Sequence, residues 1–300
     1  MTKATKVAIV TGANRGLGLA LVRGLCRALG EDAVVYLGAR DEGRGERAVR
    51  ELEAEGLRPR FARLDVADDA SVAALAARVA GEHGRVDVVI SNAAMPLTPG
   101  RPQRDQVEAF VETNNGGTRR MIRAFGPLLA DGARFLIVAS GLGRLRFLSP
   151  PARDRFDLGS LRLDDVDALL REFVQDTLDG SAQAKGWGSW INVPSKVAQV
   201  AAAAIFAREL AAEAARRDLL VNAVCPGLVD TEASRPWFSD MSRALSPDAA
   251  AADVVWLATL PPGTREPYGA LVQRRRVLPF AELVEGKTAA ELLAAMGIKA

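Results

Sequence analysis

"TGANRGLG", from Thr11 to Gly18, begins where the candidate strand Val7–Thr11 ends and leads into a helical pattern near Gly18–Leu29. A strand that ends in glycines and opens into a helix lets backbone N–H groups approach a pyrophosphate at the helix N-terminus. The spacing Gly12-x3-Gly16-x-Gly18 differs from the general G-x-G-x-x-G fingerprint, and by itself it also fits a plain glycine turn. Its place at the first strand–helix junction favours a dinucleotide site.

Strand and helix patterns alternate along the rest of the chain. The candidate strands are Val7–Thr11, Val34–Gly38, Arg60–Asp65, Val86–Ser91, Arg134–Ser140, Leu219–Cys225 and Ala270–Val272. The candidate helices are Gly18–Leu29, Gly43–Gly56, Ala70–His83, Gln103–Leu129, Asp164–Leu178 and Ser195–Arg216. This alternation predicts an α/β fold with a single Rossmann-like, doubly wound parallel sheet.

The composition excludes several classes of function. The chain has 300 residues, 49% of them apolar, and a net charge of +2, so neither a nucleic-acid face nor a basic membrane anchor is indicated. Two distant cysteines and one histidine argue against a disulfide framework, a metal site and a Ser-His triad. The start of the chain resembles no signal peptide, and no apolar run spans a membrane. We expect a cytoplasmic protein with a small-molecule substrate.

The second candidate strand ends in "GARDEGRG". Many dinucleotide sites place an acid here to hold the ribose hydroxyls, whereas an arginine accommodates a 2′-phosphate. Arg40 and Arg44, together with Arg15 of the glycine turn, favour NADP(H). A solvated basic turn is the simpler alternative for any one of these arginines.

These stretches, with "TNNGGTRRM", "CPGLVDT" and "EPYGALV", resemble the short-chain dehydrogenase/reductase family, and within it the monomeric carbonyl reductases. The resemblance covers most of residues 1–280, which it implies form one domain. It implies a helical insert of about residues 142–185, before the active-site helix, that covers the surface used elsewhere for dimerisation. A monomer is therefore expected.

The resemblance also assigns residues to a site. It implies that Asn114 holds a water in a proton relay, that Ser140 binds the substrate carbonyl, and that Lys196 binds the nicotinamide ribose. The cofactor site that it implies comprises Gly12, Asn14, Arg15, Gly16, Leu17, Gly18, Arg40, Arg44, Asp65, Val66, Asn92, Ala93, Lys196, Pro226, Gly227, Val229 and Thr231. The aromatic residues expected at the substrate are Trp187, Trp190, Trp237 and Phe238.

One position departs from the family pattern. The family carries a tyrosine four residues before the lysine, and "GWGSWINVPSK" places Asn192 there. A register shift supplies no substitute, because Tyr36 lies in the second strand and Tyr268 in a late motif. A carboxamide donates a hydrogen bond to an oxyanion but gives up no proton near neutral pH. Losing general acid catalysis typically costs a factor of about 10²–10⁴ in rate.

Three hypotheses follow. The first is an NADPH-dependent reductase of carbonyls or quinones, including polyketide-like aromatic compounds. It would take its proton from Ser140, from a water bound to Lys196 or from the substrate. The second is a non-redox enzyme that uses Ser140, Asn192 and Lys196 for dehydration, epimerisation or cyclisation. The third is a silent NADP-binding protein.

The last twenty residues, 281–300, have no counterpart in the shorter carbonyl reductases. Their apolar stripe predicts a C-terminal helix that either packs over the domain or makes a weak intermolecular contact.

Overall fold

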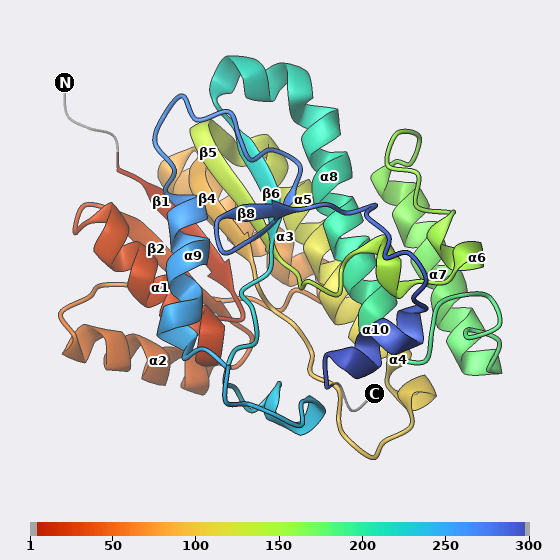
Figure 1. The fold of residues 1–300 in the computed structure, drawn as a ribbon. Helices are drawn as coiled ribbons and strands as arrows, with labels where there is room; N and C mark the ends of the chain where they lie inside the picture. The colour runs from red at the N-terminus through yellow and green to blue at the C-terminus, as the bar shows by residue number, and fades with distance from the viewer. Residues whose placement is uncertain (1–4, 298–300) are drawn as a thin grey trace.

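The computed structural model describes residues 5–297 and contains, within them, one eight-stranded sheet with the order β3-β2-β1-β4-β5-β6-β7-β8 (Figure 1). The strands are β1 (Val7–Thr11), β2 (Val34–Ala39), β3 (Arg60–Arg63), β4 (Val86–Ser91), β5 (Leu129–Val138), β6 (Leu220–Val224), β7 (Leu271–Gln273) and β8 (Arg276–Leu278). All neighbours pair in parallel except β7 and β8. The predicted doubly wound sheet is confirmed, and its order reverses between β1 and β4.

Helices cover both faces of the sheet (Figure 1). The α-helices are α1 (Gly16–Leu29), α2 (Glu42–Ala54), α3 (Asp69–His83), α4 (Val107–Val111), α5 (Gly117–Phe125), α6 (Pro150–Arg153), α7 (Leu163–Asp179), α8 (Asn192–Arg217), α9 (Pro247–Ala258) and α10 (Ala289–Ala295). Short turns of 3₁₀ or π-helix are η1 (Gln103–Asp105), η2 (Glu112–Gly116), η3 (Gly126–Leu128), η4 (Leu145–Phe147) and η5 (Arg235–Trp237).

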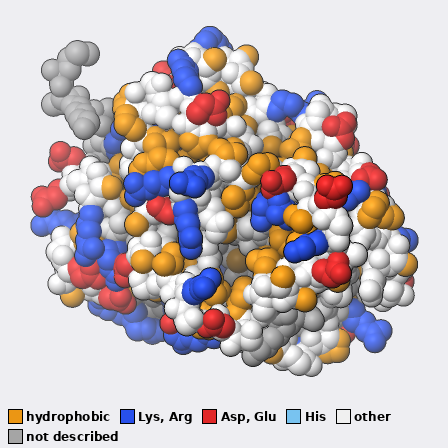
Figure 2. Space-filling view, in the orientation of Figure 1, with side chains coloured by type: hydrophobic (Ala, Val, Ile, Leu, Met, Phe, Trp, Pro, Cys, Tyr) orange, Lys and Arg blue, Asp and Glu red, His pale blue; other side chains and the backbone are white. Residues whose placement is uncertain are grey.

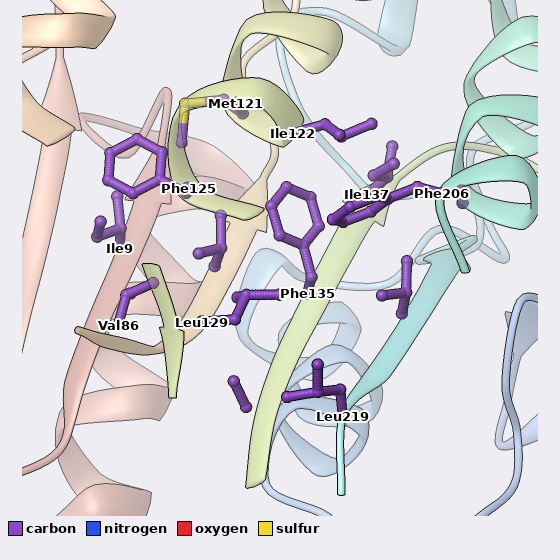
Figure 3. Packing of buried hydrophobic residues seen from close by; sticks show 14 of the residues in the cluster. Ile9, Val86, Met121, Ile122, Phe125, Leu129, Phe135, Ile137, Phe206 and Leu219 are labelled. Carbon is purple, nitrogen blue, oxygen red and sulfur yellow. The ribbon is translucent and has the colours of Figure 1, made fainter. Parts of the chain in front are cut away.

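The sheet is buried between two apolar layers. Every residue of β1, β2, β4 and β6 is buried, which explains why these strands are mostly apolar along their length rather than alternating between apolar and polar residues. On one face the strands pack against α3, α5 and α8, and on the other against α1, α2 and α9. Figure 3 shows the first layer, where Phe135 of β5 meets Phe206 of α8 in an edge-to-face contact of 5.3 Å between ring centroids.

Three elements differ from the sequence expectation. The helix expected at Gln103–Leu129 is divided into η1, α4, η2, α5 and η3, with a π-helical turn at its middle. Helix α9 was not predicted, although Ser246 before Pro247 is a typical helix start and its hydroxyl accepts a hydrogen bond from Ala249 N at 3.2 Å. Strand β8 was not predicted because Arg274 and Arg275 make the turn with positive φ, where glycine or asparagine is usual.

A third apolar cluster lies beside the sheet rather than on it. It joins α4, the insert with α6 and α7, the outer side of α8, and Leu293 of α10. The predicted C-terminal helix is thus present as the short α10, packed on the chain's own core, while its last residues, 298–300, lie outside the described part. In the described part of the chain, no helix combines the length and the hydropathy needed to cross a membrane.

Candidate active site

A cleft of about 880 Å³ runs along the carboxyl ends of the parallel strands. It includes the point between β1 and β4 where the strand order reverses, which is where open α/β sheets bind their ligands. Figure 2 shows this face of the molecule hollowed near its middle, with apolar and basic side chains gathered around the hollow.

One end of the cleft is built by the glycine turn. Gly12 has φ +63°, and a Cβ there would lie 2.7 Å from Ala93 Cα. The N-terminus of α1 follows this turn and lies at the cleft, and no side chain caps this end of the helix. The first N–H groups of α1 are therefore without a side-chain acceptor, and this arrangement fits a pyrophosphate.

The loop after β4 is fixed to this turn through Thr11. The Thr11 hydroxyl accepts hydrogen bonds from Asn92 N at 2.9 Å and from Ala93 N at 2.8 Å, and Asn92 Nδ2 donates to Thr11 O at 2.9 Å. Because these bonds join the ends of adjacent strands, Asn92 and Ala93 line the cleft next to Gly12 and Gly18.

Arginines and carboxylates share the same end of the cleft. Arg40 and Arg44 line it and are exposed. Asp41 caps α2 by accepting a hydrogen bond from Arg44 N at 2.8 Å, and Arg15 pairs with Glu232 at 2.5 Å. Arg40 has no ion pair with any described residue, so the end of the cleft offers a free guanidinium that fits a phosphate.

Three more polar side chains line the cleft. Ser140 follows the end of β5, Asn192 is the first residue of α8, and Lys196 lies one helical turn after Asn192. The Ser140 hydroxyl accepts a hydrogen bond from Leu142 N at 3.2 Å. The helix start therefore presents Asn192 and Lys196 on one face, toward the serine strand.

Lys196 is partly buried in the cleft wall. Its Nζ donates a hydrogen bond to Gln199 Oε1 at 2.7 Å. Burial lowers the pKa of Lys196 to about 8, and the neighbouring Cys225 opposes this slightly. Burial also raises the pKa of the Cys225 thiol. A lysine with such a pKa exchanges its proton near neutral pH.

Aromatic side chains form the far end of the cleft. Trp190 and Trp237 lie with ring centroids 5.9 Å apart, and Phe238 follows on the same loop. Met296, just after α10, lines the same end, and both Ser239 N and Ser239 Oγ donate to Gly297 O at 3.2 Å. The C-terminal segment is thereby attached to the loop that carries Trp237.

Comparisons with known proteins agree with this architecture. The family model for short chain dehydrogenases matches residues 6–150. Carbonyl reductase (NADPH) 1 of Sus scrofa is 36% identical over 284 residues, which cover 93% of this chain and 96% of that protein. The chain belongs to the short-chain dehydrogenase/reductase family.

Two solved structures are similar to this short-chain dehydrogenase/reductase along most of its length. Menthone neomenthol reductase from Mentha piperita has a TM-score of 0.75 and 27% identity, over 91% of this chain and 100% of that one. A metagenomic short-chain oxidoreductase in complex with NADP has a TM-score of 0.60 and 25% identity, over 91% of this chain and 99% of that one.

The cleft of this short-chain dehydrogenase/reductase brings together most of the residues singled out in the sequence. Those that line it are Gly12, Asn14, Arg15, Gly16, Leu17, Gly18, Arg40, Arg44, Asp65, Val66, Asn92, Ala93, Ser140, Trp190, Asn192, Lys196, Gly227, Val229, Thr231, Trp237 and Phe238. Three do not line it: Asn114, Trp187 and Pro226.

Trp187 was expected beside the substrate, and the structure corrects this. The side chain is 1% exposed, its indole N–H donates to Asp176 Oδ2 at 2.9 Å, and it packs against Phe156 and Phe173 of the insert. It is a core residue of the insert because its only polar atom already has a buried partner.

Asn114 lies behind the cleft wall. Its Oδ1 accepts a hydrogen bond from Met95 N at 2.7 Å, which fixes a cleft-lining loop. Its main-chain oxygen accepts from both Thr118 Oγ1 at 2.7 Å and Gln199 Nε2 at 3.0 Å. The main-chain oxygen of Asn114 therefore accepts hydrogen bonds from two protein groups. The resemblance had implied that Asn114 holds a water of the proton relay.

Several residues that line the cleft were not predicted from the sequence. Met95, Arg144 and Gln273 were not singled out. Cys225 is 5% exposed and belongs to the core, but it also reaches the cleft wall. Gln199 was missed as well; its only sequence signal is a glutamine in the otherwise apolar stretch after Lys196.

Proposed function

We propose that the protein is an NADPH-dependent reductase of carbonyl or quinone compounds in which Asn192 stands where the family has its proton-donating tyrosine. One observation carries the proposal: a single cleft joins the glycine turn and the arginines at one end to Ser140, Asn192 and Lys196 further along. The relative named carbonyl reductase (NADPH) 1, at 36% identity, supports the cofactor and the class of reaction.

The chain's own residues have separate tasks in this proposal. The N-terminus of α1 receives the pyrophosphate, and Arg40 and Arg44 bind the 2′-phosphate. NADPH supplies the hydride when bound. Ser140 and Asn192 donate hydrogen bonds to the substrate oxygen as negative charge develops on it.

The proton has three possible sources, which are the Ser140 hydroxyl, the Lys196 ammonium or a water bound to it, and the substrate itself. No tyrosine lines the described cleft: the Tyr36 hydroxyl donates to Glu82 at 2.9 Å and the Tyr268 hydroxyl to Ala207 O at 2.6 Å. Substrates that need little acid assistance, such as quinones and electron-poor aromatic ketones, are therefore the expected class. The neighbouring rings of Trp190 and Trp237, tilted by 35° to each other, suit flat molecules.

A non-redox reaction on the same scaffold is the second candidate. The absence of a tyrosine from the described cleft favours it, because Ser140 and Asn192 then form an oxyanion cradle without a phenol. Lys196, whose burial lowers its pKa to about 8, would move the proton in a dehydration, an epimerisation or a cyclisation.

The decisive experiment compares wild type with Asn192→Tyr in NADPH oxidation on a panel of quinones and diketones. Turnover by wild type supports the reductase, and loss of that turnover in Ser140→Ala would place the serine in the reaction. Turnover by the tyrosine variant alone would indicate the non-redox alternative. Fluorescence titration with NADPH serves as the control, since a protein that binds no NADPH refutes the reductase.

We also propose that the protein acts as a monomer. The insert and α10 pack on the chain's own third cluster, which supports this. Sedimentation velocity at micromolar concentration tests it, and a concentration-dependent dimer would contradict it.

A further inference from the structure

Gln199 lies at the centre of a buried hydrogen-bond network beneath the cleft. The side chain is 2% exposed and sits one turn after Lys196 on α8. Its Nε2 donates to Asn114 O at 3.0 Å and to Thr118 Oγ1 at 3.2 Å. Because Thr118 uses its own proton to donate to Asn114 O, its oxygen is free to accept.

These contacts determine which way the carboxamide faces. Both amide hydrogens of Gln199 are directed at oxygens of η2 and α5, so its oxygen must face the other way. That oxygen is the acceptor for Lys196 Nζ at 2.7 Å. Rotating the amide would place Nε2 against the ammonium and leave the Asn114 carbonyl facing an oxygen, so only one orientation satisfies the network.

The partner of Lys196 is therefore uncharged. Four carboxylates line the cleft, from Asp41, Asp65, Asp230 and Glu232, and within residues 5–297 none of them forms an ion pair with Lys196. Cys225, just after β6, is the titratable side chain whose charge raises the pKa of Lys196. Arg144 lowers the pKa of the Cys225 thiol. An ammonium has three donors, so after the bond to Gln199 two are left for the cleft.

We propose that Gln199 is a positioning residue that holds the Lys196 ammonium at the cleft wall through an uncharged acceptor, so that Lys196 itself gives the proton to the bound substrate. This rests on the proposed reductase function. Hydride addition to a carbonyl carbon leaves a negative charge on its oxygen. One N–H bond of Lys196 breaks, one O–H bond forms, and the neutral amine regains a proton from water.

An uncharged acceptor suits this task better than a carboxylate. A carboxylate within hydrogen-bond distance would stabilise the ammonium and raise the pKa of Lys196, typically by one to three pH units. The proton would then be held too tightly for transfer near neutral pH. With the neutral carboxamide, burial keeps the pKa of Lys196 at about 8.

The test is a pH titration of Lys196 by NMR in protein labelled at lysine Cε, with the signal assigned by its loss in Lys196→Met. Gln199→Glu should raise the pKa of Lys196 by at least one pH unit, and Gln199→Met should lower it, because the charged form loses its acceptor. A purely structural role would move the pKa in neither direction. Equal pKa values in wild type and in both variants would overturn the positioning role.

Gln106→Met is the matched control. Gln106 is also 2% exposed and also uses its whole carboxamide, on Thr98 and Arg101, but it has no contact with Lys196. Its replacement should lower stability and leave the Lys196 titration unchanged. If Gln199→Met does not fold, the upward shift in Gln199→Glu decides the question alone.

The donor role is tested separately, by turnover. On whichever quinone or diketone the wild type reduces, kcat/KM should fall at high pH with the pKa found for Lys196. In Gln199→Glu this fall should occur at a higher pH. If the NMR titration of Lys196 shifts in Gln199→Glu but the high-pH limb of kcat/KM does not, the donor role is overturned. If wild type reduces no substrate on the panel, the proposed function fails, while the NMR titration still decides the positioning role.

Discussion

Gly18 and Gly12 approach so closely that a Cβ on Gly18 would lie 2.3 Å from the carbonyl oxygen of Gly12. The first turn of α1 thus packs directly on the main chain of the turn before it. That contact places the N-terminus of α1 in the cleft, and it leaves no room for any side chain at position 18.

Gly18→Ala should therefore destabilise the protein by at least about 2–3 kcal/mol, since backbone atoms must move to relieve the overlap. Gly81→Ala is the control, because Gly81 lies in α3 with no atom within 4 Å of a Cβ, and alanine there should stabilise by about 0.5–1 kcal/mol. Urea denaturation of the two variants measures both effects. A Gly18→Ala protein as stable as wild type would show that the turn is looser than described.

Replacing Arg40 and Arg44 together by alanine should weaken NADPH binding about 10²- to 10⁴-fold and leave NADH binding unchanged. Each guanidinium that binds the 2′-phosphate contributes about 1.5–3 kcal/mol as a charge-assisted hydrogen bond. Cofactor fluorescence titrations give both dissociation constants. Arg50→Ala on the same helix is the control, because Arg50 is exposed and pairs with Glu46 away from the cleft. Equal losses for both cofactors would contradict a 2′-phosphate site.

Lys196 should make the stability depend on pH between about 8 and 10.5. Burial lowers its pKa from 10.5 to about 8, so within that window the unfolded chain binds a proton that the folded chain does not. Stability should rise with pH there, by on the order of 1 kcal/mol after allowance for partial exposure, and Lys196→Met should lack this rise. Denaturation at pH 8 and pH 10 measures it.

Lys185→Met controls for the loss of any lysine. The pKa of Lys185 is raised by its bond to the buried Asp176, so its contribution has the opposite sign. Its stabilising effect is present below the unfolded pKa and is lost as pH rises through the folded one. The two variants should therefore change the pH dependence in opposite directions.

Leu293→Asp should release the C-terminal segment from the domain. Leu293 is 9% exposed in the third apolar cluster, and a carboxylate there loses its apolar contacts and much of its hydration. Hydrogen–deuterium exchange should become faster in residues 289–297 and in the loop around Ser239, which bonds to Gly297. Leu283→Asp, at a leucine 50% exposed in the same segment, should leave exchange unchanged. Slow exchange in Leu293→Asp would mean that other contacts hold the segment.

The sequence by itself determined the sheet and the cofactor end of the cleft. Strands such as Val7–Thr11 are continuous apolar runs, which only a sheet covered on both faces buries, and the glycine turn follows directly in the chain. Local signals sufficed here because the strand, the turn and the helix N-terminus are adjacent in sequence. The same holds for Asn192 and Lys196, one helical turn apart on α8.

Only the tertiary structure decided which residues form the aromatic end of the cleft and which residues form the buried network around Gln199. Trp187 and Trp190 are three residues apart and have similar neighbours in sequence. Trp187 nevertheless donates a hydrogen bond to Asp176 and packs in the core with the insert, whereas Trp190 contacts Trp237 at the cleft. The role of Gln199 depends on the packing of α8 on η2 and α5, because its partners Asn114 and Thr118 are over 80 residues away in sequence. Periodicity predicts that a residue is buried, but the partner of a buried polar atom is set by which helices pack together.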